Sequence, residues 1–129
     1  MSKKSTILLV DDDMDYLFQL KFHLEKEGYQ IIPAESQKEG EKILETVKPD
    51  LAIVDLMMEN EDSGFILCRK IKNKYPDVPV IIATAVASET GISFSINTEE
   101  ERKWIKADMY LEKGIRPVQM KKEIEKLLK

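Results

Sequence analysis

The stretch Ile7-Leu8-Leu9-Val10-Asp11-Asp12-Asp13 passes from four apolar residues directly into three aspartates. A short apolar run without polar alternation is typical of a parallel strand that is buried on both faces. Similar runs recur along the chain, and each is too short for a core helix. We therefore predict five strands, at residues 6–10, 30–32, 51–54, 78–83 and 109–111.

Segments with helical periodicity separate these strands. We predict helices at residues 17–24, 36–47, 65–75 and 117–128. Ser36 and Glu39 form a capping-box pattern at the start of the second helix, and Pro117 suits the first turn of the last one. The alternation of strands and helices predicts a flavodoxin-like (βα)5 fold. In this α/β fold, a doubly wound parallel sheet of order 2-1-3-4-5 is the middle layer of a three-layer α/β/α arrangement.

Residues 84–104 interrupt the alternation. Ile92, Phe94 and Ile96 alternate with polar residues, and a second capping-box pattern at residues 98–101 precedes Trp104. We predict a long lid-like loop followed by a fourth helix. A short edge strand over the alternating residues is the alternative.

Composition limits the class of protein. A chain of 129 residues and 14.9 kDa suffices for one domain, and its apolar runs are too short to cross a membrane. The net charge of −4 disfavours a duplex-binding domain and gives no reason to expect an anionic membrane as a partner. Cys68 is the single cysteine, which excludes an internal disulfide, and no apolar signal core follows the first residues. We therefore expect a cytoplasmic location.

Polar side chains follow four of the five predicted strands. They are Asp11 to Asp13, Asp55, Thr84 and Lys113. In the predicted strand order these residues converge beyond the carboxyl edge of the sheet, which is where open α/β sheets bind ligands. Two carboxylates about 4 Å apart repel each other by about 4 kcal/mol at an effective dielectric constant near 20, so we expect a cation among them.

The residue types in this cluster indicate Mg²⁺ and phosphoryl transfer. Mg²⁺ binds through one or two carboxylates together with water and phosphate oxygens. Zinc is disfavoured, because the chain has one His and one Cys at no ligand spacing. Beside Mg²⁺ and the Lys113 ammonium, a carboxylate can attack a phosphoryl group to give an aspartyl phosphate, and the Thr84 hydroxyl can donate to its oxygens.

Four motifs, in this order, resemble the CheY-like receiver domain of two-component response regulators. They are Ile7-Leu8-Leu9-Val10-Asp11-Asp12-Asp13, Leu51-Ala52-Ile53-Val54-Asp55-Leu56-Met57-Met58, Val80-Ile81-Ile82-Ala83-Thr84-Ala85 and Tyr110-Leu111-Glu112-Lys113. The resemblance covers essentially the whole chain. It implies a flexible N-terminus at residues 1–5, one receiver domain over residues 6–129, and no output domain in this chain.

The resemblance implies roles for the acidic residues. Asp55 is the phosphoacceptor. Mg²⁺ is bound directly by Asp12, Asp55 and the backbone carbonyl of Met57, and Asp11 acts on it mainly through water. Asp13 matches no metal position of the family, and we predict that it is the N-cap of the first helix.

The resemblance also implies a switch and a control of lifetime. Thr84 and Tyr110 form the switch pair, and Lys113 pairs with the phosphoryl group. Met57 and Val86 occupy the two positions that tune the lifetime of the phosphoryl group, and both are apolar here. Because neither side chain can orient an attacking water, our hypothesis is that the phosphorylated domain hydrolyses slowly for this family.

The chain departs from the family pattern in the loops around the predicted site. Glu59 stands where the family has Pro, and Gly64 comes one residue later than usual after the acceptor. Gly114 replaces the Pro that normally follows Lys113. A cis bond to a non-proline residue costs about 3 kcal/mol, so we expect a trans peptide bond at this position.

The partners that the resemblance implies are proteins. A sensor histidine kinase or a histidine phosphotransfer protein donates the phosphoryl group. A downstream protein contacts the face formed by the fourth helix, the fifth strand and the last helix. The chain is then a binding switch and not an enzyme, since it catalyses only its own phosphorylation and dephosphorylation. Direct contact with nucleic acid and insertion into a membrane are not expected.

Three alternatives share parts of this pattern. A phosphohydrolase of the haloacid dehalogenase type uses Asp-x-Asp, which Asp11 and Asp13 formally provide, but its later acidic pair and cap domain are not visible in this length. A flavodoxin-like nucleotide-binding module needs a phosphate-cradling glycine motif, which the five glycines do not form. A degenerate receiver that acts only as a binding module is the third alternative.

Overall fold

The structure is a computed structural model that describes residues 5–56, 58, 63–84, 107–113 and 116–128. The predicted lid-like loop and the fourth helix fall within residues 85–106, outside the described residues. Met57, Val86 and the peptide bond after Lys113 also lie outside them.

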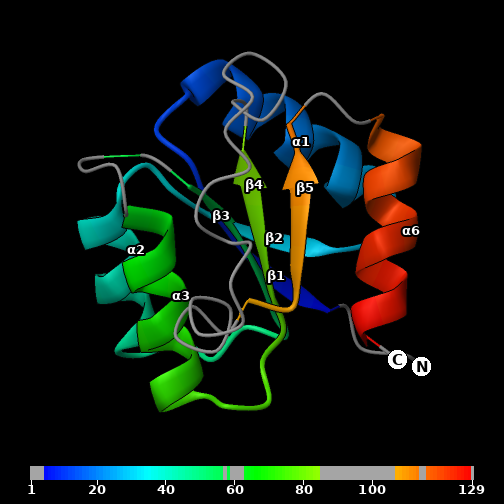
Figure 1. The fold of residues 1–129 in the computed structure, drawn as a ribbon. Helices are drawn as coiled ribbons and strands as arrows, with labels where there is room; N and C mark the ends of the chain where they lie inside the picture. Colours follow the sequence, from blue (N-terminus) through cyan, green and yellow to red (C-terminus); the bar gives the residue numbers. More distant parts are fainter. Residues whose placement is uncertain (1–4, 57, 59–62, 85–106, 114–115, 129) are drawn as a thin grey trace.

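Five parallel strands form one sheet in the order β2-β1-β3-β4-β5 (Figure 1). The strands are β1 (Thr6–Val10), β2 (Gln30–Ala34), β3 (Leu51–Asp55), β4 (Val80–Thr84) and β5 (Met109–Glu112). The register pairs Val10 with both Ala34 and Val54. Asp55 is paired with Ala83, so the carboxyl ends of the central strands are level with one another. The predicted strand order is confirmed.

Some strand bounds differ from the prediction, and proline explains two of the differences. The strand predicted at residues 30–32 continues through Pro33, which an edge strand such as β2 tolerates. The strand predicted from residue 78 begins only at Val80, because Pro79 has no backbone N–H to offer to the ladder. β3 and β4 each end one residue later than predicted, so that their last residues are polar.

Four described helices cover the two faces of the sheet. They are α1 (Met14–Lys26), α2 (Gln37–Leu44), α3 (Ser63–Lys74) and α6 (Pro117–Leu128). Figure 1 shows α2 and α3 on one face and α1 and α6 on the other, which is the predicted three-layer arrangement. The second helix ends at Leu44 and does not reach residue 47 as predicted. The caps predicted at Asp13 and Ser36 are confirmed, because Asp13 Oδ1 accepts from the N–H of Tyr16 at 3.2 Å and Ser36 Oγ accepts from that of Glu39 at 3.0 Å.

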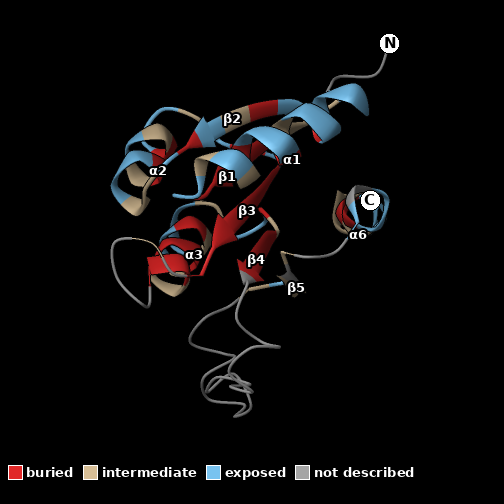
Figure 2. Ribbon diagram, turned by 90° about the horizontal axis from the view of Figure 1, so that it is seen from above, coloured by how far each residue is buried: buried red, intermediate tan, exposed pale blue. Residues whose placement is uncertain are grey.

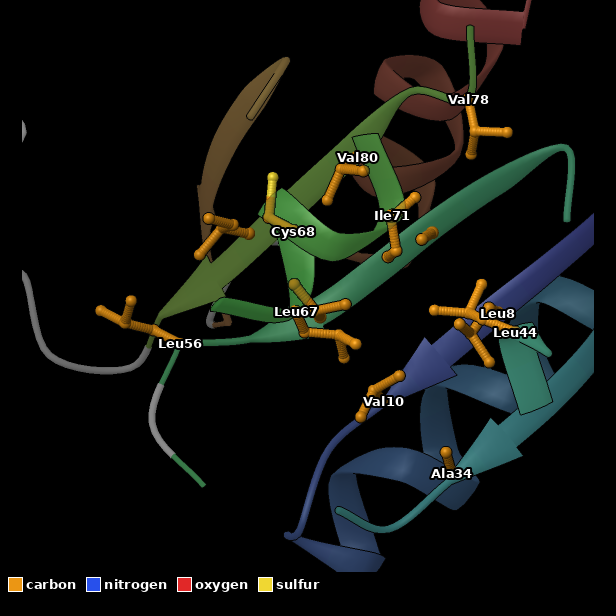
Figure 3. Packing of buried hydrophobic residues seen from close by; sticks show 13 residues of the cluster. Leu8, Val10, Ala34, Leu44, Leu56, Leu67, Cys68, Ile71, Val78 and Val80 are labelled. Carbon is orange, nitrogen blue, oxygen red and sulfur yellow. The ribbon is translucent and has the colours of Figure 1, made fainter. Parts of the chain in front are cut away.

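Two apolar clusters lie on opposite faces of the sheet, and the buried positions concentrate along the strands (Figure 2). Leu8 and Val10 face the cluster under α2 and α3, where Cys68 is fully buried (Figure 3). Ile7 and Leu9 face the cluster under α1 and α6. Because both faces of β1 are covered, the strand has no polar alternation. Cys68 is a core residue, as predicted.

Candidate functional site

Two buried carboxylates lie side by side at the carboxyl edge of the sheet. Asp11 directly follows β1 and is 1% exposed, and Asp55 is the last residue of β3 and is 6% exposed. β1 and β3 are neighbours in the sheet, so their ends meet. The backbone N–H of Asp13 donates to Asp11 Oδ1 at 2.8 Å, which fixes the orientation of this carboxylate.

The Lys113 ammonium reaches these carboxylates from the end of β5, at the edge of the described sheet. Its Nζ lies 2.8 Å from Asp11 Oδ2 and 3.1 Å from Asp55 Oδ1, and its side chain is 13% exposed. Lys113 follows β5, which is separated from β3 by β4. The long lysine side chain therefore spans the end of β4 to reach both carboxylates. The ends of the first, third and fifth strands thus meet at one cluster of charges.

Burial governs the ionisation of this cluster. It raises the pKa of Asp55 to about 7, and repulsion from Asp11 adds to the rise while Lys113 opposes it. The pKa of Asp11 is also raised, chiefly by burial, against the hydrogen bond from Lys113. Burial alone would lower the pKa of Lys113, but the two carboxylates outweigh it and the pKa is raised. The cluster therefore favours the charged form of Lys113 and resists the ionisation of both acids together.

Three carboxylates form a donor set that suits a hard divalent cation. One oxygen each from Asp11, Asp12 and Asp55 lie within 4.8 Å of one another. Asp12 is exposed, so that water has access to this side of the cluster. Mg²⁺ prefers oxygen ligands and retains several waters, which matches a site with two buried acids and one open side. The residues present fit the predicted metal.

The structure describes the remaining predicted site residues only in part. Thr84 is the last residue of β4, which lies between β3 and β5 in the sheet. Tyr110 lies in β5 and packs, half-buried, against the cluster under α2 and α3. Met57 and Val86 lie outside the described residues. The roles predicted for these four residues stay predictions.

Gly64 brings the start of α3 close to the backbone at the end of β3. Its backbone N–H donates to the carbonyl of Leu56 at 2.8 Å. A Cβ at this position would overlap the carbonyl oxygen of Asp55 and would lie 2.7 Å from Leu56 Cα. Only glycine permits so close an approach of two backbone segments. In the sequence, Gly64 indicated only that the preceding loop is one residue longer than usual. The structure shows why this residue is glycine.

Tyr16 is a residue of the site that the sequence analysis missed. The Lys113 Nζ lies over its ring, 5.0 Å from the centroid. Burial raises the pKa of Tyr16 to about 12, and the charges of Asp11 and Asp55 add to the rise, so the phenol is neutral at physiological pH. The available signal was an aromatic residue in the first turn of the helix that follows the aspartate triplet, which alone says little about contacts with a distant lysine.

A flavodoxin-like sheet with a lysine-paired acidic cluster at its carboxyl edge defines the class of this protein. The family model described as the response regulator receiver domain matches residues 7–125, which is most of the chain. The chain therefore belongs to the receiver domain family of two-component response regulators. This is not a classical enzyme family.

Two transcriptional regulatory proteins of similar sequence agree with this assignment. The chain is 30% identical to the alkaline phosphatase synthesis transcriptional regulatory protein PhoP of Bacillus subtilis over 100% of its own length and 50% of PhoP. It is 44% identical to the transcriptional regulatory protein GlrR of Escherichia coli over 67% of its own length and 19% of GlrR. The chain thus spans half or less of these relatives.

A solved structure extends the comparison to the fold and to a metal. The response regulator TrrA of Thermotoga maritima is 28% identical, with a TM-score of 0.79 over 96% of this chain and 99% of that one, and it was solved in complex with Mg²⁺ and BeF.

Among the described residues of this chain, no helix is long and apolar enough to span a bilayer.

Proposed function

We propose that Asp55 is the phosphoacceptor of a two-component phosphorelay. A carboxylate oxygen of Asp55 attacks the phosphorus of a phosphohistidine on a sensor histidine kinase or a histidine phosphotransfer protein. An O–P bond forms, the P–N bond breaks, and the imidazole nitrogen keeps the electron pair. The observation that carries the proposal is the convergence of Asp55 with Asp11, Asp12 and Lys113 at the carboxyl edge of the sheet.

The acidic residues are proposed to hold Mg²⁺. Asp12, Asp55 and the carbonyl of Met57 would bind it directly, with Asp11 acting through water. When bound, Mg²⁺ would neutralise charge that develops on the transferring phosphoryl oxygens. The donor set of three neighbouring carboxylates supports this assignment, as does the Mg²⁺ and BeF complex of TrrA.

Lys113 is proposed to change partners during the reaction. Its ammonium contacts Asp55 at 3.1 Å before phosphorylation. Once that carboxylate is phosphorylated, a phosphoryl oxygen carries the negative charge and becomes the stronger acceptor. Lys113, which lies 2.8 Å from Asp11 in the unphosphorylated structure, then holds the phosphoryl group while it keeps its contact with Asp11. The Thr84 hydroxyl is proposed to donate to another phosphoryl oxygen.

The output is proposed to be a change in protein binding. Thr84 moves toward the phosphoryl group, Tyr110 turns inward, and a downstream partner reads the change on the face formed by the fourth helix, β5 and α6. Tyr110 is half-buried at the edge strand β5, where a change of its side chain alters the neighbouring surface. The receiver unit is proposed to span residues 6–129. Met57 and Val86 are proposed to make its dephosphorylation slow.

One observation weakens the phosphohydrolase alternative. That mechanism requires Asp11 and Asp13 to act together on the substrate. Asp13 is instead exposed and caps α1, with its Oδ1 accepting from the N–H of Tyr16 at 3.2 Å. Its side chain is therefore engaged by the helix and is not a member of the three-carboxylate cluster.

Incubation with acetyl phosphate and Mg²⁺, followed by intact mass measurement, tests the proposal. We expect wild type to gain one phosphoryl group and Asp55→Asn to gain none. Asp15→Asn is a matched control, because Asp15 is exposed in the first turn of α1 and should leave the modification unchanged. No gain in wild type would make the chain a degenerate receiver, whereas release of phosphate from small phosphoesters would point to a phosphohydrolase.

A further inference from the structure

The Lys113 ammonium has a neutral partner besides its two carboxylates. Its Nζ lies over the ring of Tyr16, 5.0 Å from the centroid, within the range of about 6 Å for a cation–π interaction. The ring is half-buried and packs against the cluster under α1 and α6. The lysine side chain is only 13% exposed, so the ring and the carboxylates replace most of the water around the charge.

Tyr16 is tied to the acidic cluster through the backbone. The N–H of Asp13 donates to Asp11 Oδ1 at 2.8 Å, and the N–H of Tyr16 donates to Asp13 Oδ1 at 3.2 Å. These two hydrogen bonds join the end of β1 to the first turn of α1. The backbone of Tyr16 is therefore linked to the carboxylate of Asp11 through Asp13.

Lys113 lies just beyond the end of β5, and its ammonium is carried on a flexible four-carbon side chain. The position of the ammonium therefore depends on what its side chain contacts. Two of those contacts, Asp11 and Asp55, change their charge environment when a metal binds or when Asp55 is phosphorylated. The ring of Tyr16 carries no charge that either event changes.

We propose that Tyr16 is a positioning residue that holds the Lys113 ammonium beside Asp55 before and after phosphorylation. The inference rests on the proposed function of Asp55 and assigns Tyr16 no contact with the phosphoryl donor. The ring acts through its face, so the hydroxyl is dispensable. Tyr16→Phe should then behave as wild type, and a side chain without a π face should not.

Lysine side-chain NMR of the metal-free protein tests the contact without any phosphorylation. A ring face next to the ammonium shifts the Hε protons of Lys113 upfield. We expect this shift in wild type and in Tyr16→Phe, and its loss in Tyr16→Leu and in Tyr16→Met. A Lys113 signal without the upfield shift in folded wild type would overturn the proposal even if Asp55 is readily phosphorylated.

The rate of phosphorylation by acetyl phosphate with Mg²⁺ tests the consequence. We expect Tyr16→Leu to be slower by about fivefold, the size of a partly desolvated cation–π contact, and Tyr16→Phe to be unchanged. Phe18→Leu is the matched control, because Phe18 lies on the same helix and is 56% exposed. Tyr16→Met provides the same comparison if Tyr16→Leu does not fold.

A double-mutant cycle separates positioning from a general structural effect. In a Lys113→Gln background, Tyr16→Leu should cause no further loss of rate, because the residue acts through the ammonium. An equal fold-change in both backgrounds, or a normal rate in both Tyr16→Leu and Tyr16→Met, would overturn the proposal. A failure of wild type to be phosphorylated would instead count against the proposed function, while the NMR comparison would still decide the role of Tyr16.

Discussion

Replacement of Asp55 by asparagine should stabilise the metal-free protein at pH 8. The folded protein raises the pKa of Asp55 from 3.8 to about 7, mainly through burial and then through repulsion from Asp11. One pKa unit corresponds to about 1.4 kcal/mol, so ionised Asp55 destabilises the folded state by about 4 kcal/mol at most. Asparagine keeps the shape and removes the charge. We expect the free energy of unfolding to rise by about 2 to 4 kcal/mol.

The effect should depend on pH in a defined direction. Between pH 3.8 and about 7 the folded state holds a proton on Asp55 that the unfolded state has released. Stability falls as pH rises wherever the folded state binds more protons. The destabilisation by Asp55 is therefore absent below the unfolded pKa, grows through this window and is complete above about pH 7. The stability difference between Asp55→Asn and wild type should be large at pH 8 and small near pH 4.5.

Urea denaturation in EDTA at pH 4.5 and pH 8 measures this difference. Asp15→Asn is the control, because this carboxylate is exposed in the first turn of α1 and its removal should change stability by less than about 1 kcal/mol. If Asp55→Asn is less stable than wild type at pH 8, burial of the charge is not the dominant energy at this site. The same conclusion follows if the difference is equal at both pH values.

Three further predictions concern Gly64, the metal site and the buried Cys68. Gly64→Ala should lower the free energy of unfolding by about 3 kcal/mol in urea titrations, because its Cβ would overlap the Asp55 carbonyl; a loss below 1 kcal/mol would contradict the close approach. Saturating Mg²⁺ should raise the melting temperature of wild type, and it should raise that of Asp12→Asn much less. Equal rises would indicate that the metal binds elsewhere. Native Cys68 should react with iodoacetamide far more slowly than the urea-unfolded chain, since burial raises the pKa of its thiol to about 12; equal rates would contradict the buried position.

Much of the fold and half of the site were predictable from the sequence. Unbroken apolar runs identified β1 and β3, and the strand order brought Asp11 and Asp55 together because the carboxyl ends of parallel strands share one edge. The same rule placed Lys113 near them. These predictions succeed because they depend on strand order and not on side-chain detail.

The parts that were missed depend on contacts between distant segments. Nothing in the local sequence of Tyr16 indicates a lysine almost a hundred residues later, and its contact at 5.0 Å arises only when the fold brings the Lys113 side chain to the start of α1. The close approach of Gly64 to Asp55 likewise follows from how α3 docks. Strand ends were misjudged at Pro33 for a related reason, since tolerance of proline depends on whether a strand is at an edge.

Pro33 also bears on whether copies of this chain aggregate through β2. The backbone N–H of Gln30 donates to the carbonyl of Ser5 at 2.9 Å, and the carbonyl of Ala34 accepts from the N–H of Asp11 at 3.0 Å. Alternate residues of β2 therefore point their backbone groups toward β1. The residues between them, Pro33 included, face away from β1, toward the side on which no described residue pairs with β2. A foreign strand that paired there would find a pyrrolidine ring in place of an N–H donor. The sheet is thereby protected against growth by strand addition at that edge, without any cost to its internal ladder.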